Sequence, residues 1–149
     1  MSLVDTVRTL LKNKGSNVCS LPPHATVLDA IQMMADKSIG AILVVRDTEL
    51  IGIMSERDYA RKVVLQGKSS KDTPISEIMT SPVITVTPAH TEDECMRIVT
   101  DHRIRPLPVI EGGSLVGIVS IGDLVRSIIS AQAAVIDQLH SYIAGKYPA

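Results

Sequence analysis

Apolar residues recur along the chain in two patterns, one typical of amphipathic helices and one of short strands. After Thr26 and Asp29, a pair typical of a helix N-terminus, they follow three-to-four spacing and predict a helix. The apolar runs Ala41–Val45 and Leu50–Met54 then flank a polar turn and predict a β-hairpin. A short strand, Val18–Leu21, is expected before the helix.

Ser55 with Asp58 predicts the start of a second helix that ends near Gly67. The whole pattern then repeats without a gap 65 residues later, so one β-α-β-β-α unit occurs twice. In the second copy the expected elements are Val83–Val86, Glu92–His102, Leu107–Ile110, Leu115–Val119 around Gly112-Gly113, and a helix from Ile121.

We therefore predict an α/β (α+β) fold in which tandem β-α-β-β-α repeats pack as a pair, because one such unit buries too little apolar surface alone. The expected organisation is an N-terminal helix plus repeat 1 over residues 1–66, a polar linker over 67–74, and repeat 2 with an extended C-terminal helix over 75–149.

The helices predicted before the first repeat and at the end of the second carry apolar stripes that need a partner. The first is predicted over Val4–Asn13, and the last continues through Ile143 before Gly145 and Pro148 stop it. A homodimer is the economical way to bury these stripes.

Composition excludes several function classes. The 149 residues include 15 Lys and Arg, 16 Asp and Glu, 45% hydrophobic residues and only three aromatic residues, all Tyr. An aliphatic core argues against disorder, and balanced charge with few aromatics argues against nucleic-acid binding. The apolar runs fall far short of the roughly 20 residues that cross a bilayer. With no signal-peptide pattern and only Cys19 and Cys95, a cytoplasmic location without disulfides is expected.

The end of each hairpin carries the most informative repeated residues. Ser55 and Asp58, and likewise Ser120 and Asp123, follow a strand at a helix N-terminus, where free N–H groups favour an anion such as phosphate. A carboxylate there can accept hydrogen bonds from both hydroxyl groups of a ribose. The alternative is a simple capping box, but a glycine within each preceding strand, Gly52 or Gly117, often marks close approach of a backbone or ligand.

These elements, with His102–Val109 entering the second hairpin, resemble the cystathionine β-synthase (CBS) domain pair, or Bateman module, over about residues 16–129. The resemblance implies two repeats about a pseudo-twofold axis, two clefts for adenine nucleotides, and frequent pairing into dimers. It matches Asp58 and Asp123 to the ribose-binding aspartate, and Ser55 and Ser120 to the hydroxyl that starts the motif.

The resemblance also implies that the two clefts differ. Arg57 and Gly122 stand where the family often has a phosphate-binding Ser or Thr, and Arg105 matches a basic position whose counterpart in repeat 1 is Gly40. Arg57 could pair with phosphate, whereas Gly122 offers only an N–H group. Arg103 is a further candidate for phosphate, with a surface charge as the alternative.

Adenine contacts in this family come from two short segments in each repeat. The matching candidates are Ser16, Val18, Ile39, Gly40 and Ala41 in repeat 1, and Ser81, Val83, Ile104, Arg105 and Pro106 in repeat 2. For Ile39 and Ile104 plain core packing is the alternative. With three tyrosines, adenine must lie between aliphatic side chains.

Motifs for metal binding, a P-loop, a Rossmann turn or a catalytic nucleophile are missing from the sequence. The leading hypothesis is a non-catalytic sensor of AMP or a related nucleotide, ADP or ATP, with NAD(H) as another candidate and S-adenosylmethionine less favoured. It would act on a regulated protein that the sequence does not identify. A structural or interaction module with vestigial sites is the main alternative, and a small nucleotide-hydrolysing enzyme a weaker one.

Overall fold

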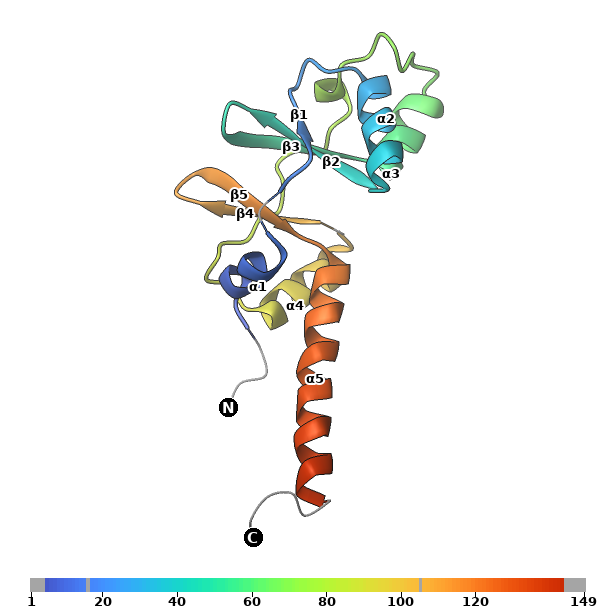
Figure 1. Cartoon of the computed structure of the whole chain (residues 1–149). Helices are drawn as coiled ribbons and strands as arrows, with labels where there is room; N and C mark the ends of the chain where they lie inside the picture. The colour runs from blue at the N-terminus through green and yellow to red at the C-terminus, as the bar shows by residue number, and fades with distance from the viewer. Residues whose placement is uncertain (1–4, 16, 105, 144–149) are drawn as a thin grey trace.

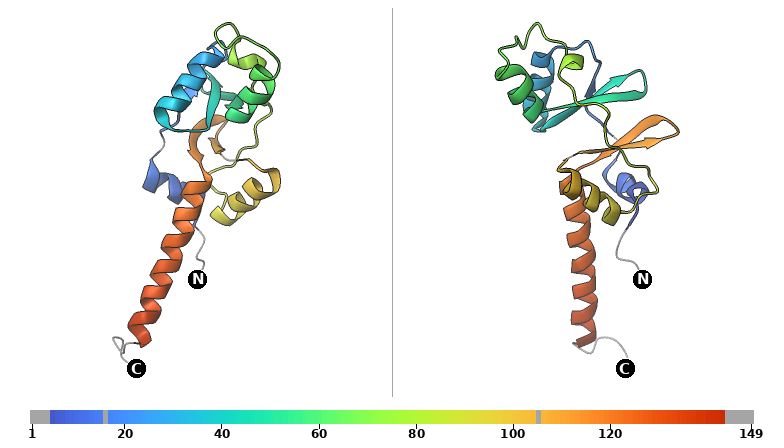
Figure 2. Two further views of the ribbon diagram at one scale, coloured as in Figure 1. Left: turned by 90° about the vertical axis from the view of Figure 1, so that its right-hand side faces the viewer. Right: turned by 180° about the vertical axis from the view of Figure 1, so that it is seen from behind.

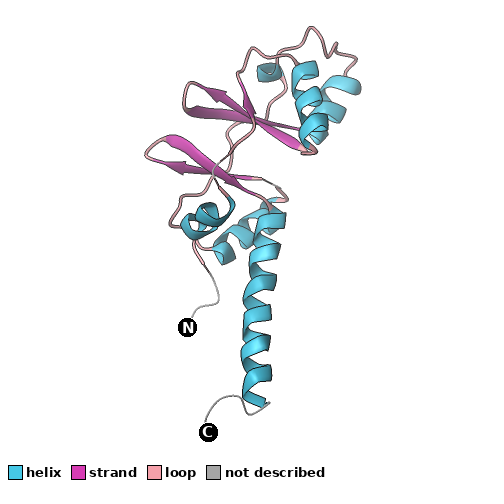
Figure 3. Cartoon of the chain, in the orientation of Figure 1, coloured by secondary structure: helices cyan, strands magenta, loops and turns pink. Residues whose placement is uncertain are grey.

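The computed structural model describes residues 5–15, 17–104 and 106–143, and shows two similar α/β units joined along the chain (Figure 1). Figure 3 shows the strands of both units lying between their helices. Residues Ser16 and Arg105, together with the predicted ends at Val4, Gly145 and Pro148, lie outside the described residues.

Repeat 1 contains β1 (Ser20–Leu21), α2 (Val27–Lys37), β2 (Ala41–Arg46), β3 (Glu49–Ser55) and α3 (Glu56–Asp58), which continues as the π-helical η1 (Tyr59–Val64). Strand β2 lies between β1, which is parallel to it, and β3, which is antiparallel. The predicted helix, hairpin and second helix are confirmed, whereas the first strand is shorter than expected.

Repeat 2 contains α4 (Glu92–His102), β4 (Leu107–Glu111), β5 (Ser114–Val119) and α5 (Ile121–Ile143). Helix α4 and the antiparallel hairpin have the predicted positions. The expected strand Val83–Val86 is wrong: only Val86 forms a bridge, to Val109 of β4. The chain just before it pairs with repeat 1 instead, since Thr80 forms a bridge with Ile53 of β3. One segment thus divides its hydrogen bonds between two sheets.

Two short helices each precede one repeat in sequence and pack against the other repeat. Helix α1 (Val7–Lys14) starts one turn later than predicted and buries Val7 and Leu10 in the core of repeat 2, beside Cys95 and Leu124. The 3-10 helix η2 (Ile75–Glu77) leads into repeat 2 but buries Ile75 in the core of repeat 1. Each core is therefore completed by the segment that precedes the other repeat.

The two hairpins lie next to each other, and their loops point the same way (Figures 1 and 2). The N–H group of Leu115, at the start of β5, donates to the carbonyl of Thr48 in the first hairpin turn, at 3.4 Å. The helices of repeat 1 and those of repeat 2 lie on opposite outer sides of this pair of hairpins.

Candidate functional site

Asp58 lies where β3 delivers the chain into α3, and its side chain is buried. Its Oδ2 atom accepts hydrogen bonds from the Ser55 N–H at 2.9 Å and the Ser55 hydroxyl at 3.0 Å. Its Oδ1 atom accepts from the Thr80 hydroxyl at 3.0 Å and forms an ion pair with Lys62 at 3.0 Å. The predicted capping box is present, but the carboxylate also binds groups outside the helix.

Asp123 has the equivalent position in the first turn of α5 and is also buried. It accepts from the Ser120 N–H at 2.9 Å, and Ser120 Oγ accepts in return from the Asp123 N–H at 3.1 Å. Two cations complete its surroundings: Lys14 at 2.5 Å and Arg126 at 2.8 Å. Each aspartate is therefore both a helix cap and a member of an ion pair.

Both carboxyl groups are held in the charged form. Burial by itself raises the pKa of Asp58, but hydrogen bonds from the Ser55 N–H, Lys62 and Thr80 outweigh it and lower the pKa below its ordinary value. Burial likewise raises the pKa of Asp123, and the bonds from Lys14 and Ser120 lower it by more. Each group is an acceptor at neutral pH, as ribose binding requires.

The partners of the two aspartates come from the segments that precede the opposite repeats. Thr80 follows η2 and leads into repeat 2, yet it bonds to Asp58 of repeat 1. Lys14 ends α1 and leads into repeat 1, yet it bonds to Asp123 of repeat 2. Each aspartate thus lies beside the segment in which the adenine contacts of the other repeat were predicted to start.

The other predicted residues of repeat 1 lie around the base of its hairpin. Ala41 is the register partner of Ser55, and the carbonyl of Gly40 accepts from the Glu56 N–H at 3.1 Å. Ile39 packs against the core of repeat 1, as its packing alternative expects. Arg57 is exposed and Val18 is half-buried.

In repeat 2, Pro106 is half-buried and directly precedes β4, whose first residue Leu107 pairs with Val119, next to Ser120. Ile104 packs against the core of repeat 2, and Arg103 is exposed. A side chain at Gly122 would lie close to the Arg126 guanidinium, at 3.3 Å.

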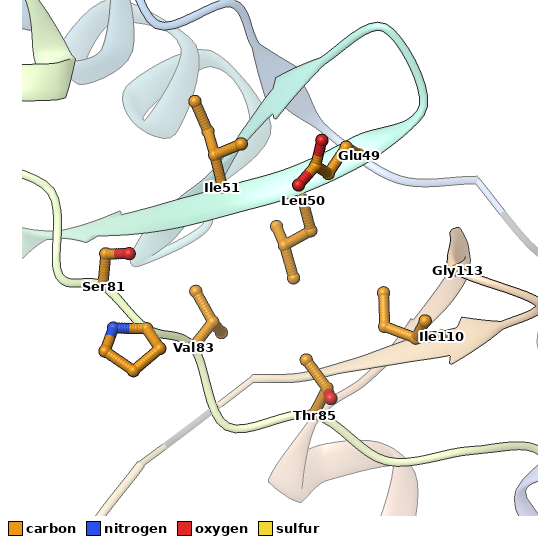
Figure 4. A pocket seen from close by; sticks show the side chains of 9 residues that line it. Glu49, Leu50, Ile51, Ser81, Val83, Thr85, Ile110 and Gly113 are labelled. Carbon is orange, nitrogen blue, oxygen red and sulfur yellow. The ribbon is translucent and has the colours of Figure 1, made fainter.

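A cleft of about 530 Å³ lies between the two hairpins, within the range of ligand pockets (Figure 4). Leu50, Val83, Thr85 and Ile110 point into it from three different segments of the chain. Of the predicted residues it contains Ser81 and Val83. The full lining is Glu49, Leu50, Ile51, Ser81, Pro82, Val83, Thr85, Ile110 and Gly113.

A second cavity, of about 470 Å³, lies between α1, α4 and α5. Asp123, Lys14 and Arg126 all line it, so the ion pairs of Asp123 face this space. The surroundings of the two aspartates differ, because Asp58 binds Thr80 and Lys62 whereas Asp123 binds Lys14 and Arg126.

The glycines that precede the two motifs have a packing role. A Cβ atom at Gly52 would overlap the Met79 side chain, and one at Gly117 would lie 2.8 Å from Leu11 Cδ2. The close approach inferred from the sequence is present, but it is made by side chains of the chain itself.

Sequence reasoning missed the cations and the facing strand residues. Lys62 and Arg126 stand four and three residues after the aspartates, a helical spacing that could have indicated ion pairs. Lys14 and Thr80 have no comparable local signal. Leu50 and Ile110 were predicted only as strand residues, because their side of the strand depends on how the hairpins meet.

The family model of the CBS domain matches residues 6–65 and again residues 75–130. The chain belongs to the CBS domain family. Its tandem repeats and their arrangement are those of a CBS domain pair.

Among curated relatives, the mitochondrial CBS domain-containing protein CBSX3 of Arabidopsis thaliana is 39% identical, covering 95% of this chain and 73% of that protein. A solved structure from Burkholderia ambifaria, provisionally described as a signal-transduction protein with CBS domains, is 50% identical with a TM-score of 0.79, covering 85% of this chain and 95% of that one. A hexameric CBS-CP12 protein from bloom-forming cyanobacteria is 30% identical with a TM-score of 0.69, covering 83% of this chain and 71% of that one.

No helix in the described part of the chain is long and apolar enough to span a bilayer. Within those same residues, no group of three or more His, Cys, Asp or Glu side chains is arranged to hold a metal ion. Because the Arabidopsis relative is named as mitochondrial, the cytoplasmic location expected from the sequence stays a prediction.

Proposed function

We propose that this CBS protein is a non-catalytic regulatory module that binds an adenine nucleotide and acts as a homodimer. AMP, ADP and ATP are the leading ligands, and NAD(H) shares their adenosine monophosphate half. The nucleotide would occupy the cleft between the hairpins, with its ribose hydroxyls on Asp58.

The observation that carries this proposal is the path of the chain from the carboxylate to the cleft. Thr80 bonds to Asp58, and the next residues, Ser81, Pro82 and Val83, line the cleft. The ribose acceptor and a wall lined by aliphatic side chains are therefore joined by one short segment. Exposed Arg57, in the same first turn as Asp58, is suitably charged for phosphate.

Binding would require Asp58 to exchange partners. Its carboxylate already accepts from Ser55, Thr80 and Lys62, so a ribose must replace one of these bonds. Lys62 is the easiest to displace, because its side chain is 43% exposed and can regain water. Nucleotide binding would thus loosen the contact of η1 with Asp58, which gives a ligand a way to act on the helices.

Titration calorimetry with AMP, ADP, ATP, NADH and S-adenosylmethionine tests the proposal, with ligand extracted from denatured protein identified by mass spectrometry. Asp58→Asn should weaken binding by roughly 10- to 100-fold, since bonds to a charged group contribute about 1.5–3 kcal/mol. Asp29→Asn is the matched control, because Asp29 has the same capping position in α2. No heat and no shift in melting temperature with any of the five would refute nucleotide binding.

The structural alternative is favoured by a specific observation: both aspartates already have a set of protein partners, and both strand glycines accommodate side chains. In that case Asp123→Ala lowers stability through the loss of the cap, which costs about 1 kcal/mol, and of the ion pairs with Lys14 and Arg126, and it changes no ligand response. Hydrolysis is tested separately, since phosphate release from ATP that Asp58→Ala abolishes would contradict the non-catalytic role.

A further inference from the structure

Helix α5 continues well beyond the body of repeat 2, as the three views show (Figures 1 and 2). It carries large apolar side chains that are 37% to 74% exposed, which we call the α5 stripe. The stripe consists of Ile121, Val125, Ile128, Ile129, Val135, Ile136, Leu139, Tyr142 and Ile143.

The spacing of the α5 stripe is that of a helix seam. From Ile121 to Tyr142 its members, with Gln132 included, follow each other at alternating intervals of four and three residues. This is the 3.5-residue period of helices that pack along their length. Ile129, Ile136 and Ile143 lie seven residues apart and widen the seam on one side.

The far half of α5 has little support from its own chain. Ile136, Leu139, Tyr142 and Ile143 are each more than half exposed, at the end that lies farthest from the repeats. Helices in proteins gain most of their stability from packing an apolar face rather than from intrinsic propensity. The stripe therefore needs a covering surface.

The composition of the stripe points to a second copy of the same chain. It contains no charged residue, so an identical stripe can face it without repulsion or buried charge. Gln132, which continues the spacing of the stripe, is the middle residue of the 23-residue helix. A glutamine amide both donates and accepts, so Gln132 can satisfy Gln132 of a second copy across a twofold axis.

The charges outside the stripe decide the orientation. Arg126 lies six residues before Gln132, and Asp137 lies five residues after it. An antiparallel pair centred on Gln132 places Arg126 of one copy within one residue of the level of Asp137 of the other, and opposes the two helix dipoles. A parallel pair would place like charges together. We propose that α5 is the dimer interface, packed antiparallel against α5 of a second copy with Gln132 at the twofold axis.

This inference gives the proposed homodimer a surface, and its test needs no nucleotide, so it fails or succeeds independently of ligand binding. Size-exclusion chromatography with light scattering should give twice the chain mass of 16.0 kDa. Ile136→Asp with Leu139→Asp should give one chain mass. Leu65→Asp is the control, because Leu65 is exposed but lies outside α5. A single-chain mass for the unchanged protein, or a dimer that persists in the double variant, would overturn the proposal.

Unfolding of the double variant is not expected, because both side chains are more than half exposed; its helical circular dichroism and melting temperature check this. Cysteine crosslinking then reads the orientation. Val125 and Leu139 are each seven residues from Gln132, on opposite sides. With Cys19 replaced by Ser, Val125→Cys mixed with Leu139→Cys should form a disulfide-linked pair, and neither should do so alone. Efficient linkage of Leu139→Cys to itself would show a parallel pair and overturn the antiparallel arrangement.

Discussion

Gly52 and Gly117 show how one residue type can favour two opposite interpretations. A glycine within a β-branched strand indicates close approach, and in both hairpins a side chain makes that approach. Met79 at the first site and Leu11 at the second belong to segments that precede the opposite repeats. The two glycines therefore help to hold the repeats together, whether or not a nucleotide binds.

Gly52→Ala should destabilise the protein by about 1–3 kcal/mol, because the added methyl group overlaps the Met79 side chain in a packed region. The double variant Gly52→Ala with Met79→Ala should show a favourable coupling energy, since the smaller residue leaves room for the methyl group. Urea denaturation of the two single variants and the double variant measures this. Additive losses would contradict the packing explanation.

The charge of Asp58 contributes stability whose pH dependence has a defined sign. Its folded-state pKa is lowered, so the contribution is fully present above the unfolded pKa of about 3.9 and disappears as the pH falls through the lower folded value. Asp58→Asn should therefore be less stable than the unchanged protein at about pH 6, and the difference should shrink below about pH 4. Denaturation at both pH values tests this; a difference independent of pH would be inconsistent with it.

Helices α1 and η2 each pack in the repeat to which their place in the sequence would not assign them. Ile75 is fully buried in the core of repeat 1, although it belongs to the segment that enters repeat 2. Val7 is fully buried in the core of repeat 2, although it precedes repeat 1. The exchange means that removing either segment damages the repeat farther from it in sequence.

Ile75→Ala should cost about 2–5 kcal/mol, as expected for a buried Ile. Hydrogen exchange should become faster in β2 and β3 of repeat 1 than in β4 and β5 of repeat 2. Ile84→Ala, in the same connecting segment but 37% exposed, is the control and should change exchange little. Faster exchange mainly in β4 and β5 would show that η2 supports repeat 2 instead.

Elements with a strong local pattern could be predicted from the sequence. Helix Glu92–His102 has the predicted ends because Thr91 and Glu94 cap its first turn and apolar residues recur at helical spacing. The absence of a strand at Val83–Val86 could not be predicted in this way, because Thr80, just before these residues, pairs with Ile53 in the other repeat. Propensity suggests extended chain there but does not identify which sheet it joins.

The residues of the candidate site likewise divide into those with a local sequence pattern and those that depend on distant partners. Asp58 and Asp123 were found because each motif spans only four residues. The partner of Asp123, Lys14, is 109 residues away, so only the packing of α1 on repeat 2 brings it there. Leu50 and Ile110 meet at the cleft for a similar reason. Local chemistry was thus predictable, whereas the neighbours that tune it depend on the tertiary structure.

The exchanged segments α1 and η2 connect the two repeats and make each depend on the other. The hairpins also meet directly, through Leu115 and Thr48. Each core contains a segment that precedes the other repeat in sequence, so neither repeat has a complete core when it is cut out at its own boundaries. We expect both repeats to unfold in a single cooperative transition.

The chain has a reporter in each repeat that can test this. Tyr59 packs against the core of repeat 1, and replacing Tyr142 and Tyr147 by Phe leaves it as the only tyrosine. Cys95 is fully buried in repeat 2. Burial, with smaller contributions from the charges of Glu94 and Glu92, raises the pKa of its thiol to about 11, so the thiol should react with thiol reagents only after unfolding. Tyrosine fluorescence and Cys95 labelling should therefore give the same guanidinium midpoint. Separate midpoints would mean that each repeat is stable without the segment it receives from the other, and that ligand-induced changes in one repeat need not reach its neighbour.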